Sequence, residues 1–136
     1  MDAIEALKTR RCIRVYTNQS VPREVVEDIV DCGRLAATAR NGQPWEFVVI
    51  TDPKRRRSIA QKTDFGRFIA NAPVCVVVLC QDSKYYLEDG CCASHNISWP
   101  PAPTDSAHAG WLVTRGRTPT RFAGRSERRI VTNWSA

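Results

Sequence analysis

Residues 37–50 read Ala-Thr-Ala-Arg-Asn-Gly-Gln-Pro-Trp-Glu-Phe-Val-Val-Ile, a polar loop that runs directly into a short apolar segment. The apolar part, residues 45–50, predicts a strand, because aromatic and β-branched side chains are enriched in strands. The polar part supplies an asparagine, a glutamine and backbone amides, which can hydrogen-bond a planar ring rich in amide groups. The stretch therefore predicts a binding loop at the start of a buried strand.

Two helices are predicted before this stretch. Asp2, with Glu5 three positions later, can cap a short helix whose apolar face holds Ile4 and Leu7. Pro22 suits the first turn of a second helix, because proline lacks only a donor that would be unpaired there. In that helix apolar residues recur at helical spacing: Val25, Val26, Ile29, Val30, Leu35 and Ala36.

A helix, a strand and another helix are predicted after it. Thr51-Asp52-Pro53 is typical of a helix start. We expect the basic run that follows to form a solvated face: Lys54, Arg55, Arg56 and Arg57. The continuous β-branched content of residues 74–79 predicts a buried strand. Residues 85–97 predict a helix, with Leu87, Cys91 and Ser94 along one side.

The composition changes after Ile97. Large aliphatic residues, Met and Phe make up 26 of the first 97 residues but only 5 of the last 39. Pro100, Pro101 and Pro103 oppose a helix, and no period of 2 or 3.6 is detectable. We therefore expect residues 98–136 to form an irregular, poorly ordered, low-complexity tail, separate from a folded part in residues 1–97.

Charge and hydropathy limit the classes of function. The net charge of +6 divides into +2 for residues 1–97 and +4 for residues 98–136. Nucleic-acid binding, a minor hypothesis that predicts strongly salt-dependent affinity, needs clustered basic contacts on an ordered face. The longest apolar stretch has nine residues, 72–80, whereas a membrane helix needs about 20. With no basic-then-apolar leader visible, we expect a cytoplasmic protein that binds neither membranes nor nucleic acid.

The cysteines and histidines do not suggest a metal site. No two of the six cysteines form a CxxC pair, and the only histidines are His95 and His108. We expect small buried thiols in a reducing compartment. No Ser-His-Asp set or paired carboxylates stand out, so no catalytic residue is assigned. We expect structural roles for His95, Tyr85 and Tyr86.

A second candidate binding segment is residues 10–14, Arg-Arg-Cys-Ile-Arg, at the end of the first predicted helix. Three arginines within five residues can bind a phosphate through bidentate hydrogen bonds. Taken alone, the pattern is also typical of an ordinary exposed surface. It gains weight from the loop at residues 37–44, which predicts a ligand with a polar ring.

Together, residues 10–14 and 37–47 resemble the nitroreductase-like family of FMN-dependent NAD(P)H oxidoreductases. That family has an Arg-Arg-Ser-x-Arg pattern near its start and a later Ser-x-x-Asn-x-Gln-Pro-Trp-x-Phe loop, followed by a strand, a helix and a strand. Residues 85–90, Tyr-Tyr-Leu-Glu-Asp-Gly, resemble the start of the family's central helix. The resemblance covers residues 1–97.

The resemblance implies an α+β fold, the family's α/β/α sandwich, in a homodimer with FMN at the subunit interface. It places Arg10, Cys12 and Arg14 at the ribityl phosphate, and Thr38, Ala39 and Asn41 of the other subunit along the flavin. The full implied cofactor-binding set is Arg10, Arg11, Cys12, Arg14, Thr38, Ala39, Asn41 and Gln43. Cys12 replaces the usual serine and is a weaker donor. Ala37 and Ala39 stand where proline and serine are usual.

The implied activity is electron transfer from NADH or NADPH, through FMN, to a nitroaromatic, quinone or similar acceptor. Ping-pong kinetics are expected, because donor and acceptor use the same pocket in turn. The alternative is a truncated nitroreductase-like domain without turnover, since the family's Gly-Leu-Gly segment and later flavin contacts are missing after residue 97.

The tail is compatible with a shifted reading frame. Degenerate codons for Ser98 to Thr114, read from the third base of each codon, permit Leu-Ala-Ala-Arg-Ala-His-Gly-Leu-Gly-Thr-Cys-Trp-Val-Ala-Gly-Asp-Lys. This reading resembles the missing family segment. Loss of one C from ATC-CTC-CTG would turn Ile-Leu-Leu into Ile-Ser-Trp at residues 97–99. The other explanation is a natural low-complexity extension.

Overall fold

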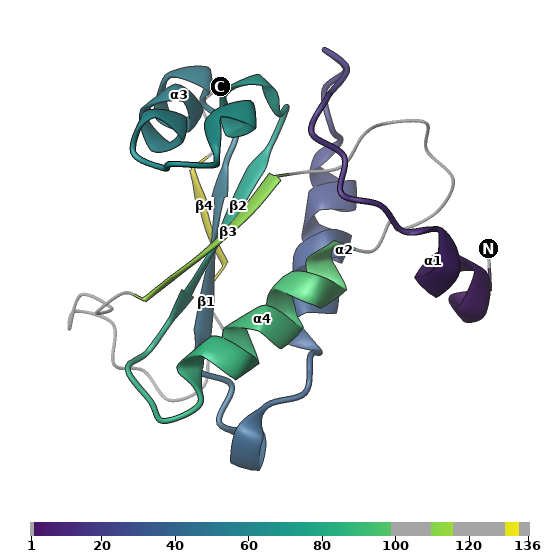
Figure 1. Cartoon of the computed structure of the whole chain (residues 1–136), viewed down its shortest axis with the longest axis vertical. Coiled ribbons are helices and arrows are strands. Elements are labelled where there is room, and N and C mark those ends of the chain that lie inside the picture. Colours follow the sequence, from purple (N-terminus) through teal and green to yellow (C-terminus); the bar gives the residue numbers. More distant parts are fainter. Residues whose placement is uncertain (1, 99–109, 116–129, 134–136) are drawn as a thin grey trace.

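The structure, a computed structural model, describes residues 2–98, 110–115 and 130–133 (Figure 1). The elements in chain order are α1 (Ala3–Thr9), α2 (Arg23–Arg34), the 3₁₀ turn η1 (Ala39–Asn41), β1 (Trp45–Ile50), α3 (Pro53–Gln61), the 3₁₀ turn η2 (Arg67–Asn71), β2 (Cys75–Cys80), α4 (Tyr86–Ile97), β3 (Gly110–Arg115) and β4 (Ile130–Asn133). Helices pack on both faces of one small sheet, which confirms the predicted α+β fold class.

The sheet is mixed, with the strand order β3-β2-β1-β4. At its centre β1 and β2 are antiparallel, with Trp45 opposite Cys80 and Ile50 opposite Cys75. The outer strands are both parallel to their neighbours, β3 to β2 and β4 to β1. The two predicted strands of residues 1–97 therefore form the middle of the sheet.

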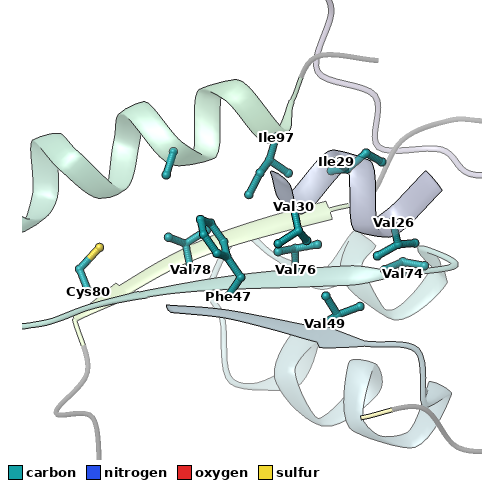
Figure 2. Packing of buried hydrophobic residues seen from close by; sticks show 11 residues of the cluster. Val26, Ile29, Val30, Phe47, Val49, Val74, Val76, Val78, Cys80 and Ile97 are labelled. Atoms are coloured by element: carbon teal, nitrogen blue, oxygen red, sulfur yellow. The ribbon is translucent and has the colours of Figure 1, made fainter. Parts of the chain in front are cut away.

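Alternate side chains of the central strands enter two separate cores. Phe47 and Val49 of β1 face α2 and α4, in a cluster that also contains Val26, Ile29, Val30, Val74, Val76, Val78, Cys80, Ala93 and Ile97 (Figure 2). Ile50 and Cys75 lie in the second cluster, with Ala60 and Ile69 from α3 and η2. Both faces are covered, which explains why residues 45–50 and 74–79 are continuously apolar rather than alternating.

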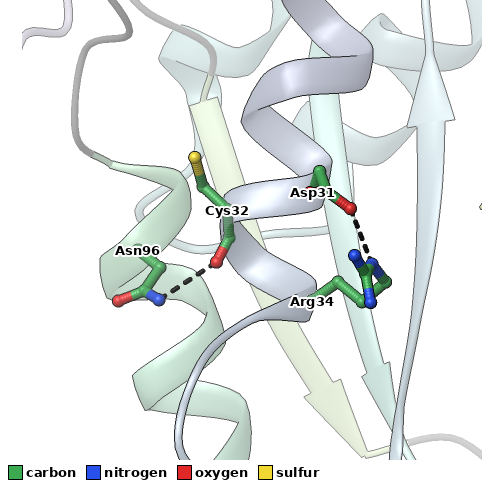
Figure 3. Close-up of polar contacts among 4 residues, drawn as sticks. All are labelled: Asp31, Cys32, Arg34 and Asn96. Carbon is green, nitrogen blue, oxygen red and sulfur yellow. Dashed lines mark hydrogen bonds and ion pairs between the residues drawn. The ribbon is translucent and has the colours of Figure 1, made fainter.

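The helices α2 and α4 pack against each other and cover one face of the sheet. The side-chain amide of Asn96 donates to the backbone carbonyl of Cys32 at 3.0 Å, and Arg34 pairs with Asp31 within α2 at 2.6 Å (Figure 3). The helices approach closely at Gly33, where an added Cβ would lie 2.7 Å from Cγ1 of Ile97. Only a glycine fits this crossing without displacing its neighbour.

The predicted helix boundaries agree closely with the structure, and the caps explain why. Asp2 accepts from the backbone N–H of Glu5 at 2.8 Å, and Asp52 accepts from that of Lys54 at 2.8 Å. Pro22 is the cap residue of α2. Each cap satisfies or avoids a backbone donor that the first helical turn would leave unpaired.

Several apolar residues at predicted helix positions are exposed. α1 buries no residue, so Ile4 and Leu7 stay more than half exposed in one protomer. On α4 the residues that face the core are Asp89, Gly90, Ala93, Ser94 and Ile97, so Leu87 and Cys91 are not on that side. Leu35 is also exposed. Leu35 is the C-cap residue, just after the end of α2. On α1 and α4 the helical period was correct, but the sequence does not show how a helix is oriented against its partners.

Arg56 is a further correction, because it is buried rather than part of a solvated face. It is 8% exposed, and its guanidinium donates to the backbone carbonyl of Thr51. Nε has no hydrogen-bond partner among the described residues. Burial lowers the pKa of Arg56. The other three basic residues of the run remain exposed.

The expectation of buried thiols holds for two of the six cysteines. Cys75 and Cys80 are buried, whereas Cys12, Cys32, Cys91 and Cys92 are exposed. Burial raises the pKa of Cys75 to about 11, and burial together with the nearby Asp89 carboxylate raises that of Cys80 to about 11. All six are free.

The segment expected to be irregular contains β3 and β4, neither of which the sequence analysis predicts. Residues 111–114, Trp-Leu-Val-Thr, and residues 130–132, Ile-Val-Thr, are locally rich in strand-forming residue types. The low apolar content of the whole tail hides these short runs. The expectation for residues 99–109, 116–129 and 134–136 lies outside the described residues.

In the described part of the chain no helix has the length and apolar character that a membrane span requires. The cytoplasmic location stays a prediction.

Candidate functional site

The predicted phosphate-binding residues lie on an extended segment, here called the N-terminal arm (residues 10–22). Arg10 ends α1 with a ψ of 131°, which turns the chain from helix into extended backbone. Its guanidinium lies 3.5 Å from Sγ of Cys12. Arg11 donates to the backbone carbonyls of Lys8 and Arg10, each at 2.9 Å. The arm therefore brings Arg10, Arg11 and Cys12 close together.

Arg14 lies against η2. Its guanidinium carbon is 5.6 Å from the ring centroid of Phe68, and the ring of Tyr16 is 6.5 Å from the same ring. Burial raises the pKa of Tyr16, while the positive charge of Arg14 opposes that shift. Arg14 is thus fixed by a cation–π contact, which attaches the arm to the sandwich.

No carboxylate among the described residues forms an ion pair with Arg10, Arg11 or Arg14. This absence leaves three positive charges within five residues without an acidic partner in the described chain. A phosphate group would complement such a cluster, because charge-assisted arginine–phosphate hydrogen bonds are strong and directional. The positive charges and N–H donors of the arm are therefore suited to the phosphate group of FMN.

The second predicted segment, here called the loop (residues 38–43), is a compact turn around η1. The backbone N–H of Asn41 donates to the carbonyl of Thr38 at 3.2 Å, and that of Gly42 to the carbonyl of Ala39 at 3.1 Å. The backbone N–H of Gln43 donates to the hydroxyl of Thr38 at 3.3 Å. The loop therefore satisfies several of its own backbone groups.

Three residues of the loop have positive φ without being glycine: Arg40 at 55°, Asn41 at 55° and Gln43 at 46°. They are the only such non-glycine residues among those the structure describes. Each costs of the order of 1–3 kcal/mol, and such strain persists only where surrounding contacts enforce it. Backbone strain of this kind concentrates at ligand-binding and active sites.

The side chains of Asn41 and Gln43 form a complementary pair. Nε2 of Gln43 donates to Oδ1 of Asn41 at 2.7 Å. This contact leaves Nδ2 of Asn41 as a donor and Oε1 of Gln43 as an acceptor, with no partner among the described residues. A flavin has donors and acceptors along its pyrimidine edge, so the loop fits the ring in chemistry as the arm fits the phosphate.

Asp89 is the residue that sequence reasoning missed. It is 6% exposed in the first turn of α4, and its Oδ1 accepts from the backbone N–H of Ala39 at 2.9 Å. The signal was present, since residues 85–90 were among those that resemble the family, but no role followed from them.

One protomer does not bring the arm and the loop together. Arg14 lies against η2, on the side of the molecule where α3 covers the sheet, whereas η1 lies beyond the C-terminal end of α2 (Figure 1). The 12 residues of α2 alone extend over about 18 Å. The two segments therefore lie apart in this chain, and the family resemblance implies that a second copy of the chain would bring them together.

Within the described residues no group of three or more His, Cys, Asp or Glu side chains could hold a metal ion. His95 is exposed in the last turn of α4. Tyr86 packs against the main core, which agrees with a structural role, while Tyr85 is 37% exposed. The arm and the loop offer groups that can bind an anion and a polar ring.

Comparisons with known proteins show what the chain resembles in sequence. A family model described as "Nitroreductase family" matches residues 7–64, a range that includes the arm and the loop. A protein of Methanothermobacter thermautotrophicus named "Putative NADH dehydrogenase/NAD(P)H nitroreductase" is 33% identical over 102 residues, which cover 71% of this chain and 53% of the relative. An iodotyrosine deiodinase of Haliscomenobacter hydrossis is 37% identical over 59 residues, covering 43% of this chain and 27% of the relative.

The fold resembles that of solved nitroreductases. An FMN-dependent nitroreductase of Clostridium difficile superimposes with a TM-score of 0.65 at 30% identity, covering 69% of this chain and 57% of that one. The chain spans about half the length of the curated relatives it matches. The described elements form an α+β sandwich similar to that of this nitroreductase. In sequence and in fold, the chain is nitroreductase-like.

Proposed function

We propose that residues 1–97 form the FMN-binding part of an oxidoreductase that passes electrons from NADH or NADPH to a nitroaromatic, quinone or similar acceptor. The observation that carries the proposal is the combination of three arm arginines that have no carboxylate partner among the described residues and a strained polar loop, on a nitroreductase-like fold. Bound FMN would supply the hydride and electron chemistry that the described side chains do not.

The chain's own residues would bind and orient that cofactor. Arg10 and Arg14 would neutralise the phosphate, with Arg11 and Cys12 beside them. Thr38, Ala39, Asn41 and Gln43 would line the ring from the partner protomer of a homodimer. The distance between the arm and the loop within one protomer supports this composite site. The exposed apolar residues of α1, Ile4 and Leu7, are suited to burial at such an interface.

A second candidate function is a nitroreductase-like domain without turnover. It is favoured by one observation, namely that the family's Gly-Leu-Gly segment does not occur in residues 98–136. The frame-shift hypothesis explains the same fact. The match to the Methanothermobacter relative covers 71% of the chain, which is the fraction that residues 1–97 make up. We propose that residues 98–136 are read out of frame.

Assays of two proteins distinguish these candidates. One is the 136-residue chain, and the other restores the frame after Ile97 so that Gly-Leu-Gly and Ala-Gly-Asp-Lys follow. Each is assayed with NADH and NADPH against a nitroaromatic. We expect little turnover from the 136-residue chain and clear turnover from the frame-restored protein. Full activity in the 136-residue chain would refute the hypothesis of a truncated domain without turnover. Inactivity of both proteins would refute the proposed oxidoreductase activity.

A further inference from the structure

Asp89 is a buried carboxylate with no basic partner among the described residues. It is 6% exposed, and no Lys or Arg of the described chain pairs with it. Burying a carboxylate is costly unless hydrogen bonds compensate for the water that it loses. The compensation observed is the backbone N–H of Ala39, 2.9 Å away and 50 positions earlier in the chain.

The contact joins α4 to the strained loop. Within the loop, the backbone N–H groups of Asn41, Gly42 and Gln43 donate only to Thr38 and Ala39, and the side chain of Gln43 donates to that of Asn41. These bonds close the loop on itself but do not fix it to the rest of the fold. Asp89 holds the first residue of η1, while the carbonyl of Pro44 accepts from the backbone N–H of Gln81 at 2.9 Å.

A purely local role for Asp89 in its own helix does not account for the geometry. The cap residue of α4 is Tyr85, which makes no side-chain cap hydrogen bond, and the described bond of Asp89 goes to the loop. Ser94, also buried in α4, shows the local alternative, since its hydroxyl donates to the carbonyl of Gly90 at 2.7 Å. The helix dipole favours an acidic residue in the first turn of α4.

We propose that Asp89 is a positioning residue: it holds the backbone N–H of Ala39 and thereby fixes loop residues 38–43 in the conformation that presents Thr38 and Asn41 to the flavin. The inference rests on the proposed function for its ligand. The tether itself does not, since it is formed in the chain without a cofactor.

The first test measures the loop in the 136-residue chain without FMN. Amide hydrogen exchange is followed at Ala39 in Asp89→Ala, Asp89→Asn and Glu88→Ala. Asp89→Ala removes the acceptor, so protection of the Ala39 amide should fall by about tenfold or more. Asp89→Asn keeps an acceptor oxygen and should retain most of the protection. Glu88→Ala, which removes a neighbouring exposed carboxylate from the same turn, should leave it unchanged.

The second test measures the dissociation constant of FMN for the same proteins. Asp89→Ala should raise it about tenfold or more, Asp89→Asn should restore most of the affinity, and Glu88→Ala should stay within about twofold of wild type. If Asp89 only stabilised the fold, Asp89→Ala would lower the thermal stability. The folded Asp89→Ala and Asp89→Asn variants would then bind FMN with equal affinity.

If Asp89→Ala fails to fold, Ala39→Pro tests the same hydrogen bond by removing its donor. The substitution leaves α4 intact. The preceding residue, Thr38, has φ −134° and ψ 153°, a conformation that a following proline accepts. Faster amide exchange at Gly42 and weaker FMN binding are expected.

The outcomes separate the two proposals. Unchanged Ala39 protection in folded Asp89→Ala overturns the tether. Lost protection with unchanged FMN affinity overturns the positioning role. If the wild-type chain binds no FMN, the proposed function of this chain fails, and a drop in Ala39 protection that is confined to Asp89→Ala still supports the tether.

Discussion

Gly33 of α2 and Ile97 of α4 are in such close contact that a Cβ added at Gly33 would lie 2.7 Å from Cγ1 and 2.9 Å from Cδ1 of Ile97. Cε1 of Phe47 lies 3.1 Å from the same point. This close contact packs α4, the helix that carries Asp89, against α2.

Replacing Gly33 with alanine should therefore destabilise the fold. The added methyl group overpacks the crossing, which costs about 1–3 kcal/mol, while the better helix propensity of alanine returns up to about 1 kcal/mol. The free energy of unfolding in urea measures the net loss. In the double variant Gly33→Ala/Ile97→Ala the two losses should be less than additive, because Ile97→Ala removes the atoms that clash. Strict additivity would show that this contact does not limit the packing.

Arg56 should matter more to stability than its neighbours in the basic run. Arg56→Ala removes a buried hydrogen bond to the carbonyl of Thr51 and should lower the free energy of unfolding by about 1–3 kcal/mol. Arg57→Ala, at an exposed position, is the matched control and should change it by less than about 0.5 kcal/mol. Equal effects of the two substitutions would place Arg56 in solvent, as the sequence alone predicted.

Stability should fall at alkaline pH because of the two buried thiols. The pKa of Cys75 and that of Cys80 are about 11 in the folded chain, against 9.0 for an ordinary thiol. Between these pH values the folded chain binds more protons than the unfolded chain, so the free energy of unfolding decreases as pH rises. Urea denaturation from pH 8 to pH 11 should show the decrease, and Cys75→Ala should reduce its slope. A slope unchanged in that variant would contradict the burial of a protonated Cys75.

Much of the fold could be predicted from residues that act locally. Asp2, Pro22 and Asp52 gave the helix starts, since a cap depends on only a few neighbouring residues. The strand at residues 45–50 was predicted with its observed bounds. The orientation of each helix against its partners could not be predicted, because Leu87 and Asp89 lie on the same helix and only the tertiary packing decides which is buried.

The candidate site was predictable in its parts and not in its assembly. Arg10, Arg14 and Asn41 were singled out by residue type and spacing, and they remain predictions as FMN contacts. The hydrogen bond from Ala39 to Asp89 links positions 50 residues apart, so no local pattern could reveal it. The positive φ values at Arg40, Asn41 and Gln43 were equally invisible, because no glycine marks them.

The central claim is that the arm binds the phosphate of FMN. It is tested most directly by the affinity of the frame-restored protein for FMN, compared between the unsubstituted protein (here the wild type) and its Arg10→Ala and Arg14→Ala variants. Each arginine removed should weaken binding by about 1.5–3 kcal/mol, or about 10- to 150-fold, because each contact joins charged partners. Arg57→Ala, an exposed arginine outside the arm, should leave the dissociation constant unchanged. Saturable FMN binding that both arm variants weaken is the predicted result. No FMN binding by the wild-type protein, or equal binding by all four proteins, would contradict the account.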